Sequence, residues 1–255
     1  EFIDKKLDDY MAQKAADKNV PHLLIDRFRF DSFKTDELNG QKNTLLSRFG
    51  STIYLFFTIT PPQETVERAW KRGLSTSRYK AVDDLLYHNI EAFKGIPQLF
   101  FSWMEIKEKD IHFEFLDNDV PLGESPKTVA FGRNGVMTVL DPIALSNIDR
   151  FKEVNTSARN ACEVLDQNWR PNYNFLKQCI EMVSRVEFVN NQSFEIYGRT
   201  EMGHWDYTNS RTVGSSPELH LILSELGWKK SNKQKQTKIE RIDVKSQKIE
   251  TLGAW

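Results

Sequence analysis

Residues 51–73 constrain the fold of this chain more than any other stretch. Residues 51–60 are an almost uninterrupted run of β-branched and aromatic residues, which predicts a strand buried on both faces, as in a parallel sheet. Two prolines follow at once, and Thr60 can cap a helix there, with Gln63 completing a capping box and Gly73 ending the helix. A buried strand that leads directly into a helix is the joint at which α/β proteins bind their ligands.

The sequence before this joint repeats the same alternation of helix and strand. Residues 3–18 have apolar residues at helical spacing, residues 20–30 read as a second buried strand, and residues 34–48 read as a crossover helix. This order predicts an α/β fold with a mainly parallel sheet flanked by helices. We expect the strands at 22–27 and 52–59 to be parallel, adjacent and central.

After Gly73 we expect a helix over 79–94, ended by Gly95 and Pro97, and then short strands and a hairpin around Asn134-Gly135, which is a strong turn signal. Beyond Pro142 helices predominate, with a second hairpin among them. We therefore expect a division near residue 142 between an α/β part, residues 1–141, and an α+β extension, residues 142–255. The remaining predicted elements are strands at 98–103 and 111–116, a hairpin over 127–141, helices at 143–153, 156–167, 172–185 and 217–226, and a hairpin pairing 186–190 with 194–197.

Composition indicates a globular protein of a reducing compartment. The net charge of −1 excludes a global field that would attract nucleic acid or a membrane, although residues 229–248 carry eight Lys or Arg against two acidic residues. The two cysteines form no CxxC pair, and there is no signal peptide or apolar run long enough to span a bilayer. We expect a cytoplasmic protein. The chain begins at Glu1 rather than at Met, which indicates a piece of a longer protein.

Two groups of charged residues are candidates for binding a ligand. Asp26, Arg27 and Arg29 follow the carboxyl end of the predicted strand, where they could form a substrate rim or a solvated loop with local ion pairs. Arg68 and Arg72 lie at i and i+4 on the predicted helix. With Arg78 in the following loop, they could clamp a phosphoryl group or simply solvate a surface helix; the planar fork of arginine suits phosphate oxygens. No HExxH, GxSxG or metal-ligand spacing occurs, so we expect no metal.

Residues 142–255 are rich in aromatic side chains. Most should pack into the core, but Trp205, Tyr207 and Trp255 could form a patch that binds a partner, because Tyr and Trp dominate such patches. The basic tail beside them would steer an acidic partner, although a solubilising tail is the simpler interpretation.

The order of these elements, with segments 23–31, 54–73 and 78–91, resembles the later half of a P-loop kinase of the zeta-toxin group over roughly residues 1–141. The resemblance implies transfer of a phosphoryl group from ATP, with Mg²⁺, to an activated sugar or a related small molecule. It places Asp26 at a substrate contact and Arg68, Arg72 and Arg78 in a phosphate-binding lid. No GxxxxGK[ST] loop occurs in the chain, and that loop supplies much of the catalysis in such enzymes.

Three hypotheses follow. In the first, the chain is the later part of a small-molecule kinase that needs a P-loop upstream of Glu1 and is inactive without it. In the second, it is a catalytically silent kinase-like adaptor or structural subunit of a larger bacterial assembly, such as a secretion or conjugation system. The third, a nucleic-acid partner acting through the tail, is the least favoured by the composition.

Overall fold

The computed structural model describes residues 2–18, 22–26, 51–201, 204–206 and 217–227. The helices are α1 (Phe2–Ala16), α2 (Pro62–Thr76), α3 (Val82–Met104), α4 (Pro142–Arg150), α5 (Asn174–Met182) and α7 (Pro217–Glu225), with a 3₁₀ turn at Ala161–Glu163. The strands are β1 (Thr52–Ile59), β2 (Asp110–Asp117), β3 (Lys127–Arg133), β4 (Val136–Val139), β5 (Arg185–Val189), β6 (Ile196–Glu201) and β7 (His204–Asp206).

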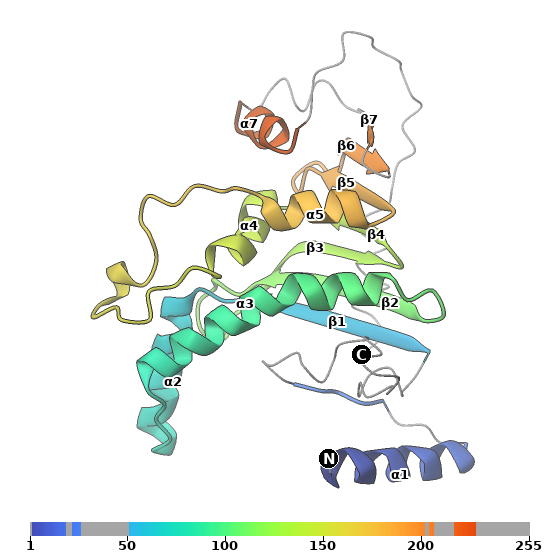
Figure 1. The fold of residues 1–255 in the computed structure, drawn as a ribbon, viewed down its shortest axis with the longest axis vertical. Coiled ribbons are helices and arrows are strands. Elements are labelled where there is room, and N and C mark those ends of the chain that lie inside the picture. The colour runs from blue at the N-terminus through green and yellow to red at the C-terminus, as the bar shows by residue number, and fades with distance from the viewer. Residues whose placement is uncertain (1, 19–21, 27–50, 202–203, 207–216, 228–255) are drawn as a thin grey trace.

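The seven strands form one sheet in chain order, with α3, α4 and α5 against one of its faces (Figure 1). The α/β class is as predicted, but the sheet is mixed. Only the pairs β1–β2 and β4–β5 are parallel, and the other four pairs are antiparallel. Two helical crossovers keep the strand direction, whereas each of the other connections reverses it. The prediction of a mainly parallel sheet was therefore wrong.

Strand β1 is not the central, doubly buried strand that its composition suggested. Its side chains alternate strictly, so that Ile53, Leu55, Phe57 and Ile59 are buried while the residues between them are exposed. Within the described strands β1 has one neighbour, β2, and so lies at an edge of the sheet. The described part of the predicted strand at 22–27, residues 22–26, forms no regular structure and pairs with no described strand, and Arg27 lies outside the described residues.

Helix α3 continues through Pro97 to Met104, so the predicted strand at 98–103 was wrong. The reason is the helical spacing of its apolar residues, because Phe93, Ile96, Phe100 and Trp103 are all buried. Burying that face against the sheet offsets the hydrogen bond that a proline removes from a helix interior.

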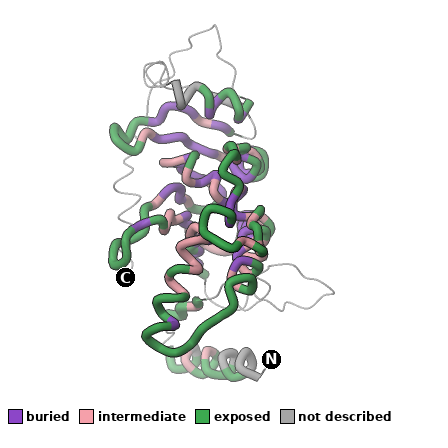
Figure 2. Tube along the Cα trace, turned by 90° about the vertical axis from the view of Figure 1, so that its left-hand side faces the viewer, coloured by how far each residue is buried: buried purple, intermediate pink, exposed green. Residues whose placement is uncertain are grey.

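One hydrophobic core spans both sides of residue 142. It joins Phe57 and Phe115 of the first strands to Phe175 of α5 and Phe188 of β5. Figure 2 shows the buried stretches of the chain in purple. Strands β4 and β5, which pair in parallel, also come from opposite sides of that position. The division predicted near residue 142 thus coincides with no break in the sheet or in the core.

The later described elements match the sequence predictions except at two places: strand β7, which was not predicted, and the helix predicted at 156–167. Both hairpins are confirmed, and Asn134 and Gly135 have the positive φ values, 49° and 80°, of a type I′ turn. The helix predicted at 156–167 is absent from the described structure apart from its 3₁₀ turn. Side chains of Asn155, Asn160 and Asp166 accept hydrogen bonds from the backbone two residues on, which favours turns over a helix.

Candidate functional site

The joint between β1 and α2 is closed by contacts within the chain. The hydroxyl of Thr60 accepts a hydrogen bond of 3.0 Å from the side-chain amide of Asn118, at the end of β2. Thr60 therefore does not cap α2; Pro61 occupies the N-cap position and makes no side-chain cap hydrogen bond in the described structure. The predicted capping box was wrong because its threonine binds the neighbouring loop instead.

Arg68 makes further contacts at the joint between β1 and α2. Its guanidinium donates hydrogen bonds of 3.0 Å to the backbone oxygens of Asn118 and Val120, and its Nε lies 3.6 Å from Glu64. These bonds tie α2 to the loop that follows β2. Both hydrogen bonds come from Nη2, so Arg68 positions α2 against this loop with two of its five guanidinium donors.

The other predicted site residues do not gather around this joint. Arg72 and Arg78 are exposed at the far end of α2 and in the loop after it. Asp26 is exposed in the irregular segment 22–26, and Trp205 lies in β7, where its backbone pairs with Thr200. The structure does not describe the side chain of Trp205. Three further predicted residues lie outside the described residues: Arg29, Tyr207 and Trp255.

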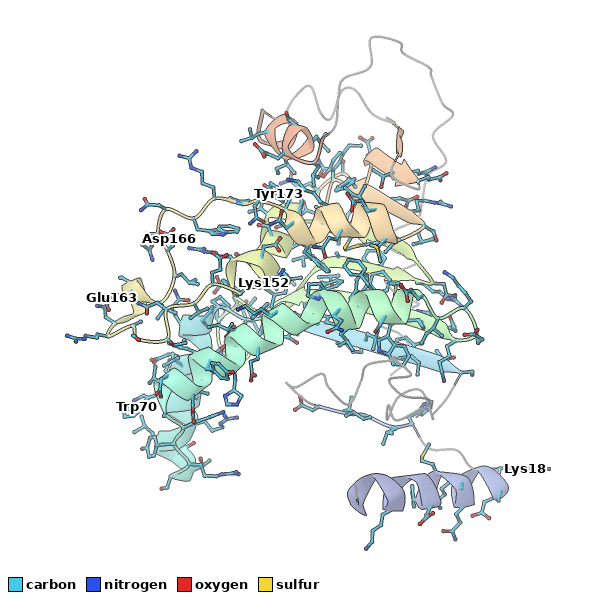
Figure 3. All side chains as sticks on the ribbon, viewed as in Figure 1. Lys18, Trp70, Lys152, Glu163, Asp166 and Tyr173 are labelled. Atoms are coloured by element: carbon cyan, nitrogen blue, oxygen red, sulfur yellow. The ribbon has the colours of Figure 1, made fainter. Side chains whose placement is uncertain are left out.

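Helices α2 and α3 form a hairpin that extends beyond the sheet, at the lower left of Figure 1. Its end is rich in large apolar side chains that are about half exposed. We call this set the hairpin tip: Trp70 (56% exposed), Leu74 (62%), Tyr79 (56%), Val82 (46%) and Tyr87 (54%). Figure 3 labels Trp70 at the outer side of the hairpin. Clustered exposed apolar groups of this kind mark interaction sites more often than scattered ones do.

Gly73 shapes the tip. It is buried inside α2 rather than ending it, because the ring of Tyr79 lies against the helix backbone there. A methyl group on Gly73 would lie 2.5 Å from Cδ1 of Tyr79. The same ring lies 5.3 Å, centroid to centroid, from that of Trp70. The helix ends three residues later, at Thr76, where Ser77 adopts a left-handed conformation and its N–H bonds the oxygen of Gly73. The prediction that Gly73 terminates the helix was therefore wrong.

This contact predicts a coupling between Gly73 and Tyr79. In a helix interior, Gly→Ala normally stabilises by about 1 kcal/mol. In the wild-type chain that gain should be reduced or absent, because the new methyl displaces the tyrosine ring. In a Tyr79→Ala background the full gain should return, giving a coupling of about 0.5–1 kcal/mol in a urea-denaturation double-mutant cycle. Equal effects of Gly73→Ala in both backgrounds would show that the ring does not lie on the helix.

A second polar cluster lies on β2, and alternation in the sequence could have revealed it. Asp110, His112 and Glu114 are two residues apart and share one face of the strand. The guanidinium of Arg133 pairs with Asp110 at 2.6 Å and holds the pKa of that carboxyl below its usual value, and His112, 3.2 Å away, adds to the effect. His112 also stacks on Tyr54 of β1 at 4.6 Å. These contacts fasten the β3–β4 turn to the start of β2, since Asn134 also contacts Asp110.

The hairpin of β5 and β6 carries a third charged group on one face. Buried Glu187 pairs with Arg185 at 3.3 Å and with Arg199 at 3.2 Å, and Glu201 lies 3.2 Å from Arg185. The four residues form two cross-strand pairs, Arg185 with Glu201 and Glu187 with Arg199. Opposite charges directly across antiparallel strands stabilise the pairing of the strands. The four charges of this group are paired with one another, so stabilising the hairpin is enough to explain them.

Neither the metal-ligand geometry of the described residues nor a comparison with known proteins points to a function. Within the described residues, no group of three or more His, Cys, Asp or Glu side chains is placed to hold a metal ion. No helix there has both the length and the hydropathy needed to cross a bilayer. No protein-family model, curated protein or solved structure matches the chain.

Proposed function

We propose that this protein acts by binding, as an adaptor, and that the hairpin tip is its contact surface. The observation that carries the proposal is the Trp70–Tyr79 pair, held on Gly73 at the end of a projecting hairpin and still more than half exposed. Trp, Tyr and Arg are the residues that contribute most to binding at interfaces. Arg72 and Arg78 stand beside the pair in the sequence and are exposed as well.

The base of the hairpin supports the proposal. Arg68 fastens α2 to the loop after β2, and α3 is anchored in the core by Phe100 and Trp103. The tip is therefore presented on two helices whose other ends are fixed. A surface that is ordered before binding loses less conformational entropy when its partner arrives.

Fractionation of the native host tests the proposal. Wild-type protein should elute with a larger assembly or a particulate fraction, whereas the Trp70→Ala/Tyr79→Ala double variant should elute at the size of the free chain. Leu122→Ala is the matched control, because Leu122 is an even more exposed apolar residue, at 89%, in the loop after β2 and outside the set that forms the tip. The proposal fails if the double variant fractionates as the wild-type protein does, or if the control loses its association equally.

Phosphoryl transfer is the second proposal, and one observation favours it. Strands β1 and β2 are parallel, and α2 begins directly after β1. The carboxyl edge of such a pair is where α/β proteins bind ligands. Arg72 and Arg78 are exposed, but they lie at the far end of α2 and in the loop after it, away from this edge. Among the described residues, two of the five guanidinium donors of Arg68 already bind carbonyl oxygens, and no group of three or more His, Cys, Asp or Glu side chains is placed to hold Mg²⁺.

Nucleotide binding separates the two proposals. For this chain alone we expect ATP with Mg²⁺ to leave the melting temperature unchanged at micromolar concentrations, since no P-loop cradles the β-phosphate. A saturable rise that Arg72→Ala and Arg78→Ala abolish would instead favour phosphoryl transfer. Differential scanning fluorimetry with ATP–Mg²⁺ against Mg²⁺ alone makes the measurement.

A further inference from the structure

The side chains of the hairpin tip indicate which class of partner it binds. Resting on the proposed function, we infer that the tip binds the surface of an anionic lipid bilayer, with its aromatic and aliphatic side chains entering the interface and its basic side chains facing the headgroups. The juxtaposition that carries the inference is the half-exposed set Trp70, Leu74, Tyr79 and Val82 alternating along the chain with Lys71, Arg72, Arg78 and Lys80.

The apolar members favour lipid over nucleic acid. Single-stranded nucleic acids engage aromatic rings by stacking, which would suit Trp70 and Tyr79. Leu74 is 62% exposed and Val82 46% exposed, and an aliphatic side chain gains little from a base face. The boundary between headgroups and acyl chains accepts both kinds, because Trp and Tyr combine an apolar ring with a polar group and Leu and Val enter the hydrocarbon.

The charge favours an anionic surface. Residues 69–82 contain four basic residues and no acidic one, in a chain whose net charge is −1; Asp83 and Asp84 follow directly, so the basic excess lies over the end of α2 and the loop before α3. Lys71 pairs with Glu67 at 3.2 Å, but both side chains are more than half exposed, so solvent screens the pair. Arg72 and Arg78 are exposed. Basic residues beside an amphipathic segment add affinity for negatively charged lipids within a Debye length of the surface.

The shape fits the same partner. The tip is the end of a helical hairpin that projects beyond the sheet (Figure 1). Figure 2 shows this end of the hairpin largely exposed. A projecting apolar end with long basic side chains beside it can enter a bilayer interface while its charged groups reach the headgroup layer.

Vesicle flotation with the full chain tests the inference. We expect wild-type protein to float with vesicles of phosphatidylcholine and phosphatidylserine, to float poorly with phosphatidylcholine alone, and to be released by added salt. Trp70→Ser/Leu74→Ser and Arg72→Glu/Arg78→Glu should each lower binding to the anionic vesicles by about tenfold or more. Leu122→Ser should bind like the wild-type protein, and melting temperatures confirm that each variant is folded.

Three results overturn the inference. The first is that wild-type protein does not float with anionic vesicles, and the second is that the tip variants float as well as the wild-type protein does. The third is that a single-stranded oligonucleotide displaces the protein from the vesicles and stays bound to the tip. Unchanged flotation would assign the binding to another part of the chain, such as the basic residues 229–248. If vesicles fail while host fractionation still depends on Trp70 and Tyr79, the proposed binding function stands with a protein partner.

Discussion

Replacing Phe100 with alanine should lower the free energy of unfolding by about 3–5 kcal/mol, a large part of the about 5–15 kcal/mol that stabilises a typical domain. Phe100 is fully buried on α3. Its ring lies 4.9 Å from that of Phe113, 5.3 Å from that of Phe115 and 5.8 Å from that of Phe175. The loss combines the transfer of the side chain out of the core with the cavity that the surrounding rings cannot fill.

The number of unfolding transitions is as informative as the loss of stability. Because Phe175 belongs to α5 and Phe113 to β2, Phe100 joins parts of the chain on both sides of residue 142. Circular dichroism and tryptophan fluorescence in urea should therefore report one cooperative transition, shifted as a whole. Leu122→Ala, at an exposed position, should leave it in place. Two separate transitions, of which only the first shifts, would support independent units divided near residue 142.

Replacing Asp149 with alanine should cost about 3 kcal/mol. One carboxylate oxygen of this buried residue in α4 accepts a 2.9 Å hydrogen bond from the backbone of Phe175, in the first turn of α5, and the other lies 2.8 Å from Nζ of Lys152. Tyr173, at the N-cap of α5, has a positive φ and supplies no side-chain cap. Asp149 therefore caps α5 from another helix, and its removal leaves a buried N–H without an acceptor.

Asp149→Asn separates the two contributions. An amide oxygen can still accept from the N–H of Phe175, so asparagine should retain about half of the stability that alanine loses, while the attraction to Lys152 disappears. Asp83→Ala, at an exposed position in the first turn of α3, is the control and should change stability by less than about 1 kcal/mol. Urea midpoints make the comparison. Asn and Ala variants of equal stability would show that the cap contributes nothing.

Local sequence signals predicted most of the secondary structure, and long-range packing decided the exceptions. The pair Asn134-Gly135 predicted a hairpin correctly, because Asn and Gly readily adopt the positive φ values that its turn requires. Pro97 read as the end of a helix, but the apolar spacing of Phe93, Ile96 and Phe100 was the stronger signal. The run at 51–60 suggested a doubly buried strand because hydrophobicity alone does not reveal where in a sheet a strand lies.

Long-range contacts at the candidate site could not be predicted from the local sequence either. Arginine spacing on α2 was visible in the sequence, but not the loop carbonyls that bind Arg68, which come from residues some fifty positions later. The tip left one signal in the sequence: Trp70 and Leu74 are four residues apart on a helix that also carries five charged residues. The predicted aromatic patch at Trp205, Tyr207 and Trp255 stays a prediction, since the structure describes none of these side chains.

Site-specific photo-crosslinking in the native host tests most directly whether the hairpin tip is the functional surface. A photoreactive phenylalanine analogue at Leu74, which is 62% exposed, samples the tip, and one at Leu122, which is 89% exposed, serves as the control. We predict an abundant adduct at position 74, with the mass of a lipid if the further inference holds, and little at position 122. Adducts at position 74 no more abundant than those at position 122 would contradict a binding role for the tip.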